Sequence, residues 1–183
     1  SAFTDGNDFV IMTQNGTANT KTAYVITCGA GDDVLIASAA KDTISGGSGA
    51  DKIDGGGAAD TLTGGAGADT FQYSSGDAQF GSEDTITDFT TGTDKIEINV
   101  TNTNATFKAN FNKSTTGVNM ASYLTTNEDG EAAYDSKNGT LIVDLNGDGA
   151  LGGNDIFVTS SAEIKAEDLV YNITSKGSAV ETV

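Results

Sequence analysis

Residues 28–72 read, in five consecutive blocks of nine, CGAGDDVLI, ASAAKDTIS, GGSGADKID, GGGAADTLT and GGAGADTFQ. Each block has aspartate at its sixth place and a large apolar residue at its eighth. The aspartates are Asp33, Asp42, Asp51, Asp60 and Asp69, and the apolar residues are Leu35, Ile44, Ile53, Leu62 and Phe71. Glycine fills most of the first, second and fourth places. A repeat this regular predicts stacked copies of one short structural unit.

The residue types within one block predict a turn followed by a strand. Glycine turns tightly because it adopts positive φ without a steric penalty. The strand that follows directs the eighth-place side chain inward and its neighbours outward. Two blocks make one coil, so residues two blocks apart in sequence stack on the same side. Carboxylates and free carbonyl groups then collect at the turns, and these are the oxygen ligands that Ca²⁺ prefers.

The pattern G-G-x-G-x-D-x-U-x resembles the nonapeptide repeat of the RTX family of secreted bacterial proteins. The resemblance implies a parallel β-roll with Ca²⁺ between stacked turns, and it pairs Asp33 with Asp51, Asp42 with Asp60 and Asp51 with Asp69. The glycines implied in these sites are Gly29, Gly31, Gly46, Gly47, Gly49, Gly55, Gly56, Gly64, Gly65 and Gly67. The second block departs from the pattern, because ASAA stands at residues 37–40, and this departure bears on the Asp42–Asp60 site.

The chain on either side of the repeat shows related patterns. Downstream, D-T-I-x-D-F-x-x-G-x-D-K-I-x-I, from Asp84 to Ile98, resembles the segment by which serralysin-type secreted proteases pass from their roll into a C-terminal β-sandwich. The resemblance implies Asp84, and less strongly Asp88, as a further calcium ligand. The alternative is that both aspartates cap turns around Asp88-Phe89. Upstream, DGNDFVIM is a partial repeat in which Asp8 binds calcium or caps a turn. We expect an irregular first coil, with strands near Phe9–Met12 and Tyr24–Thr27.

The last third of the chain contains a different acidic loop, DLNGDGALGGND. Its proposed ligands, at the spacing of an EF-hand loop, are Asp144, Asn146, Asp148, the carbonyl of Ala150, and Asp155. Strands at Ala132–Tyr134 and Thr140–Leu145, joined by an Asn-Gly turn, precede it. The loop is therefore either a weak calcium site without the EF-hand fold or a plain hairpin turn. We also expect a short helix in residues 120–127, a turn or helix in 162–169, and a last strand near Val170–Ile173.

Composition excludes several functions. The formal net charge is −17 with nine lysines and no arginine, so nucleic acid and anionic membrane surfaces are poor partners. The acidity serves either solubility or cation binding. Histidine is absent, which excludes a Ser-His-Asp triad and the H-E-x-x-H zinc motif. The lone Cys28 excludes an internal disulfide, and no apolar run is long enough for a transmembrane helix. We predict no catalytic residues and no enzyme activity.

These patterns predict an all-β chain in which a β-roll (residues 1–80) continues into a sandwich (residues 81–183). We expect a calcium-binding C-terminal module of a bacterial surface protein, resembling surface-layer proteins. It would be exported by the type I secretion machinery, fold outside the cell on binding Ca²⁺, and self-associate in a surface lattice. The alternative is the non-catalytic domain of a secreted serralysin-type metalloprotease. Ligand or ice binding by a flat repeat face is a third hypothesis, which the mixed outward residues disfavour. The start within a repeat predicts a fragment of a longer protein, and the terminal AVETV loosely resembles a type I secretion signal.

Overall fold

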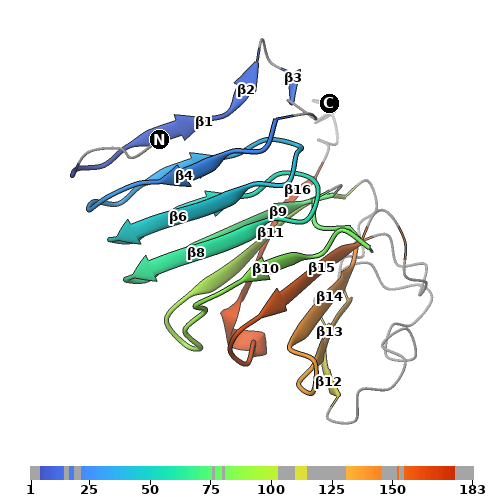
Figure 1. The fold of residues 1–183 in the computed structure, drawn as a ribbon. Coiled ribbons are helices and arrows are strands. Elements are labelled where there is room, and N and C mark those ends of the chain that lie inside the picture. The colour runs from blue at the N-terminus through green and yellow to red at the C-terminus, as the bar shows by residue number, and fades with distance from the viewer. Residues whose placement is uncertain are drawn as a thin grey trace, which may run out of the picture.

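The structure is a computed structural model, and it describes residues 5–14, 17–18, 22–75, 77–79, 81–102, 110–114, 131–145, 152 and 155–175. Two stacked β-sheets contain most of the strands (Figure 1). The larger sheet has the order β12-β13-β14-β15-β10-β8-β6-β4, and the smaller sheet, behind it in Figure 1, has the order β1-β5-β7-β9-β11-β16. The all-β prediction is therefore confirmed.

The strands are short, as a nine-residue unit requires. In the larger sheet they are β4 (Val25–Thr27), β6 (Thr43–Ser48), β8 (Thr61–Ala66), β10 (Asp84–Ile86), β15 (Ile156–Ser160), β14 (Thr140–Asp144), β13 (Glu131–Asp135) and β12 (Asn110–Ser114). In the smaller sheet they are β1 (Phe9–Ile11), β5 (Val34–Ile36), β7 (Lys52–Asp54), β9 (Thr70–Ser74), β11 (Lys95–Asn102) and β16 (Leu169–Ser175). A two-stranded hairpin, β2 (Thr13–Gln14) and β3 (Thr17–Ala18), stands apart.

Successive blocks alternate between the two sheets, so the chain winds as a parallel roll. Ile44 aligns with Leu62 in the larger sheet, and Leu35 aligns with Ile53 in the smaller one. The members of each aligned pair are two blocks apart in sequence, as the repeat predicted. The eighth-place side chains point between the sheets and form the core, where all five are fully buried. Burial of these side chains stabilises the stack by removing apolar surface from water.

The roll continues beyond the nonapeptides. Thr85 and Ile86 of β10 align with Thr61 and Leu62 of β8, which is a wider spacing than two blocks. In the smaller sheet, Ile96 of β11 aligns with Phe71 of β9, again farther apart in sequence than two blocks. The D-T-I and D-K-I triplets therefore form one more coil, with longer turns than the coils before it. The partial repeat at the N-terminal side does the same, since β1 aligns with β5 across a similarly lengthened coil.

The C-terminal strands complete both sheets. β15 pairs parallel with β10, and β16 pairs parallel with β11. An antiparallel meander of β13, β14 and β15 then widens the larger sheet. Both predicted strands around the Asn-Gly turn are present, and the segment 162–169 contains the short 3₁₀ helix Ala166–Asp168. The helix expected in residues 120–127 lies outside the described residues.

The outward residues of the roll separate by sheet. Apart from Val25, the outward residues that flank the buried Ile26, Ile44, Leu62 and Ile86 in the larger sheet all carry a hydroxyl group: Thr27, Thr43, Ser45, Thr61, Thr63, Thr85 and Thr87. The later outward positions of β6 and β8 are the glycines Gly47 and Gly65. Those of the smaller sheet include charged pairs such as Lys52 with Glu97, at 2.8 Å. The outward residues looked mixed in the sequence because consecutive blocks belong to different sheets.

Candidate calcium-binding turns

The repeat aspartates form two rows, one at each edge of the roll. The first aspartate row stands before the strands of the smaller sheet and contains Asp8, Asp33, Asp51, Asp69 and Asp94. The second aspartate row contains Asp42 and Asp60, which directly precede β6 and β8, and Asp84, the first residue of β10. Within each row, the backbone N–H of one aspartate donates to Oδ1 of the next, at 2.7–3.0 Å. The three predicted pairings are therefore neighbours in the structure.

The second carboxylate oxygen, Oδ2, differs from Oδ1 because in most of these aspartates it has no hydrogen-bond partner. Oδ2 is buried without a hydrogen-bond partner in Asp8, Asp33, Asp51, Asp60 and Asp84. A buried polar atom without a partner costs free energy, and more so when the group is charged. A bound cation would remove that cost. These atoms, rather than the mere number of acidic residues, are the observation that fits a metal.

The glycines leave room for aspartate carboxylate oxygens and backbone carbonyl oxygens to lie close to the turn backbone. A Cβ atom added at Gly46 would lie 2.2 Å from Oδ2 of Asp51, within the same turn. A Cβ added at Gly47 would lie 2.1 Å from the carbonyl oxygen of Gly29, in the preceding coil. Gly65 has the same relation to the carbonyl of Gly47, at 1.9 Å. Glycine is therefore needed at these places because any side chain would enter the space between stacked turns.

The same relations hold at the other proposed glycines. The first-place residues Gly55 and Gly64 lie against Asp60 and Asp69, and the fourth-place residues Gly49 and Gly67 lie against the carbonyls of Gly31 and Gly49. Gly56 lies against the carbonyl of Ser38, which belongs to the exceptional second block. In the described residues, no three Asp, Glu or Cys side chains form a metal cluster by themselves. A Ca²⁺ ion here would therefore take carbonyl oxygens as well as carboxylates, and the stacked turns supply both.

Burial raises the pKa values of several aspartates in the two rows. Burial raises the pKa of Asp60 to about 7, with Asp42 and Asp77 adding repulsion. Burial also raises the pKa of Asp69 to about 6 and that of Asp84 to about 8. Hydrogen bonds from the backbone oppose these shifts without cancelling them. Without a cation, these carboxylates therefore hold protons at a higher pH than an ordinary aspartate does.

Asp84, Asp88 and Asp94 have different positions at the end of the roll. Asp84 is fully buried and continues the second row. Asp88 accepts hydrogen bonds from the N–H groups of Gly64 and Gly65, at 3.0 and 2.8 Å, and so caps the last glycine turn. Asp94 ends the first row and also accepts from the Thr90 N–H. The sequence reading left Asp94 out of the site, although its D-K-I triplet repeats D-K-I of the third block.

The proposed EF-hand-like loop is described only in part. Asp144 and Asp155 are fully buried at its two ends, and Oδ2 of Asp155 accepts a 2.7 Å hydrogen bond from the Gly152 N–H. Asn146, Asp148 and Ala150 lie outside the described residues. Calcium binding by this loop stays a prediction.

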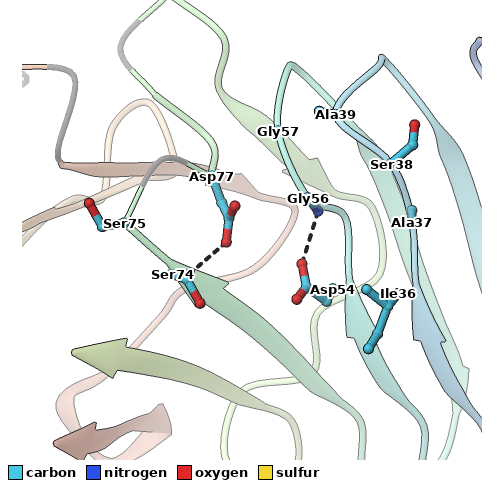
Figure 2. A pocket seen from close by; sticks show the side chains of 10 residues that line it. All are labelled: Ile36, Ala37, Ser38, Ala39, Asp54, Gly56, Gly57, Ser74, Ser75 and Asp77. Atoms are coloured by element: carbon cyan, nitrogen blue, oxygen red, sulfur yellow. Dashed lines mark hydrogen bonds between the residues drawn. The ribbon is translucent and has the colours of Figure 1, made fainter. Parts of the chain in front are cut away.

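Figure 2 shows a cavity of about 370 Å³ at the second edge, beside the turns that carry the second row. The carboxylates of Asp54 and Asp77 face one another across it, each held by a backbone N–H, from Gly56 and Ser74 respectively. Burial raises the pKa of Asp77 to about 7, and repulsion from Asp54 adds to the shift. Sequence reasoning missed this pair, because Asp77 lies in the lengthened turn, outside the nonapeptide phase.

Cys28 has no exposed, activated thiol. It is buried, and burial raises its pKa to about 11, with Asp33, Asp8 and Asp51 adding repulsion. A thiol with so high a pKa is a poor nucleophile. The described residues also contain no helix with the length and apolar character that a membrane span requires.

Comparison with known families gives one match. The family model described as "Peptidase M10 serralysin C terminal" matches residues 4–171. No protein in the curated collection searched matches the chain. The family match spans the nonapeptide turns, the lengthened coil and the C-terminal strands together.

Proposed function

Because the chain belongs to the serralysin C-terminal family, we propose that it is a calcium-binding folding and export module of a type I-secreted bacterial surface protein, similar to those of surface layers. Modules of this family are non-catalytic parts of secreted proteins and generally bind calcium. The observation that supports calcium binding by this chain is the set of buried Oδ2 atoms without partners, beside stacked glycine carbonyls.

Each residue type would have a separate role. The aspartates whose Oδ2 has no protein partner, together with carbonyls such as those of Gly29, Gly31, Gly47 and Gly49, would hold the ion between turns. Bound Ca²⁺ would supply the positive charge that offsets neighbouring buried carboxylates. Asp51 would serve two sites, because it neighbours both Asp33 and Asp69 in the first row.

The net charge links these sites to folding. At −17, the chain repels itself in the absence of cations, and the ligands are far apart when it is unfolded. Affinity for the metal then becomes stability of the fold. Sites of sensor-like or extracellular affinity, about 10⁻⁷ to 10⁻³ M, would stay largely empty in the cytosol and fill outside. The chain would thus cross the secretion channel unfolded and fold on the far side, and calcium bridges between copies could then support a surface lattice.

A calcium titration followed by circular dichroism tests the proposal. Asp51→Asn is the informative variant, because the amide oxygen can still accept the Asp33 N–H while the charge is lost. We expect the calcium midpoint of folding to rise at least tenfold. Asp32→Asn is the matched control, since Asp32 is exposed in a neighbouring turn and accepts the Ala50 N–H at 2.7 Å. Its midpoint should stay within about twofold of the parent chain.

Two results would reject calcium-coupled folding. One is an unchanged β-sheet signal and melting temperature after chelation of the parent chain. The other is an equal shift of the calcium midpoint in the Asp51→Asn and Asp32→Asn variants. Such a result would mean that the loss of any negative charge has the same effect, wherever the aspartate lies.

The second candidate function is the non-catalytic domain of a secreted serralysin-type hydrolase, with which the family match is equally consistent. Both candidates require the same turns and the same calcium dependence. An H-E-x-x-H motif encoded in the same reading frame would decide for the hydrolase. Attachment of the purified protein to bacterial surfaces would decide for the surface protein.

A further inference from the structure

The turn of residues 37–42 satisfies its aspartate with protein groups. Oδ1 of Asp42 accepts the Tyr24 N–H at 2.7 Å. Oδ2 accepts two hydrogen bonds from Ser38, one from the backbone N–H at 2.9 Å and one from the hydroxyl at 2.8 Å. The Ser38 hydroxyl oxygen also accepts the Ala40 N–H at 3.1 Å. This network is closed, because both carboxylate oxygens of the buried Asp42 have partners.

The open glycine turns lack such a network. In Asp33, Asp51 and Asp60 the equivalent Oδ2 is buried and has no partner. A Cβ added at Gly46 would collide with the carboxylate of Asp51, and one added at Gly55 would collide with that of Asp60. The Ser38 hydroxyl thus gives Asp42 a hydrogen bond that Oδ2 of Asp33, Asp51 and Asp60 does not have.

The backbone of this turn is different as well. The second and fourth places of the third block, Gly47 and Gly49, have φ of +125° and +136°. The fifth block repeats this alternation at the same two places. No residue from 37 to 42 has a positive φ. The turn of residues 37–42 therefore lacks the alternation of positive φ that the third and fifth blocks share, although the Ser38 carbonyl still lies against Gly56 of the next coil.

We propose that Ser38 replaces calcium in the turn of residues 37–42, so that this turn takes no cation while the glycine turns do. The inference rests on the proposed calcium binding of the glycine turns and identifies Ser38 as the residue that decides which turns bind. In this turn the hydroxyl and the backbone N–H of Ser38 donate hydrogen bonds to the Asp42 carboxylate. Their partial positive charges take the place of the positive charge of an ion.

One consequence is an uneven distribution of calcium. In the first aspartate row Oδ2 of Asp8, Asp33 and Asp51 is open to an ion, whereas Asp94 is closed, because its Oδ2 accepts the Thr90 N–H. The second row binds only beyond Asp42, at Asp60 and Asp84. A second consequence is that the coil at residues 37–42 keeps its hydrogen bonds at low calcium, provided that the neighbouring coils are folded.

The test counts calcium ions bound per chain by equilibrium dialysis, with Asp42→Asn and Asp51→Asn as a matched pair. Both aspartates hold the sixth place of their block, and both are buried. We expect Asp51→Asn to lose at least one ion and Asp42→Asn to lose none. The complementary variant, Ala37→Gly with Ser38→Gly and Ala40→Gly, restores the glycine pattern and should gain one ion.

Each outcome decides the question. Loss of an ion in Asp42→Asn, or no gain in the glycine variant, would overturn the inference while leaving calcium binding by the other turns intact. A parent chain that binds no calcium would refute the proposed function, and a glycine variant that also binds none would overturn this inference with it. Should Asp42→Asn fail to fold, the count in the glycine variant decides alone.

Discussion

Gly65→Ala should destabilise the protein strongly, although it adds only one methyl group at a turn. Gly65 has φ of +111°, a region that costs other residues about 1–3 kcal/mol. Its new Cβ would also lie 1.9 Å from the carbonyl oxygen of Gly47, which is backbone and cannot rotate aside. Overpacking of this kind adds about 1–3 kcal/mol. We therefore expect a total loss of about 4 kcal/mol.

The assay is thermal unfolding in saturating calcium, and the matched control is Gly92→Ala. Gly92 also has positive φ, at +81°, but no atom lies within 4 Å of the position of its Cβ. The Gly92→Ala variant should therefore lose only about 1–2 kcal/mol of stability, which is the cost of placing alanine in the left-handed region. For a domain of this size about 1 kcal/mol lowers Tm by about 2–4 °C, so Gly65→Ala should melt about 8–16 °C below the parent. Equal losses in the two variants would refute the argument that the stacked carbonyl causes the difference.

Three further outcomes follow from the structure. Ala58 has φ of +80°, so Ala58→Gly should gain about 1 kcal/mol in chemical denaturation, whereas Ala68→Gly, where φ is not positive, should show no gain. The pKa values of Asp60 and Asp84 are raised to about 7 and about 8, so the folded calcium-free chain holds protons that the unfolded chain has released above about pH 4. Its stability should fall as the pH rises from about 4 through 8, and melting temperatures that rise with pH in calcium-free buffer would contradict this. Lys52→Ala breaks a partly exposed 2.8 Å ion pair with a glutamate of β11, and urea denaturation should show a loss below about 1 kcal/mol.

The roll was predictable because its signal is strict and local. The nine-residue period predicted where the turns lie, and the apolar residue at the eighth place of each block predicted the core. Leu35 and Ile53 align as the spacing of two blocks required. The next coil was harder to predict, because Ile86 and Ile96 follow their partners at wider and unequal spacings, which no fixed period reveals. Only the repeated D-x-I triplets carried that signal.

Parts of the candidate site depended on contacts that a one-dimensional pattern lacks. The replacement of GGxG at residues 37–40 was visible, but the closed network of Ser38 and Asp42 was not. Asp88 was left between ligand and cap, and its two hydrogen bonds to a distant glycine turn identify it as a cap. The pairing of Asp54 with Asp77 arises only because the lengthened turn folds back beside the second edge. Such contacts are set by turn geometry rather than by residue spacing.

The lengthened coil also makes the module a natural host for grafted sequence. Between β9 and β10 the chain is longer than the nonapeptide repeat requires, yet the Asp60 N–H still meets Oδ1 of Asp84 at 2.8 Å and the strands stay in register. Register is therefore held by the aspartate contact and the buried triplet, and the turn length is free to vary. Each doubling of a flexible turn costs only about 0.6 kcal/mol in closure entropy. Peptide epitopes inserted after the exposed Gly81 should be displayed at the edge of the scaffold, with the contact between Ser74 and Asp77 kept.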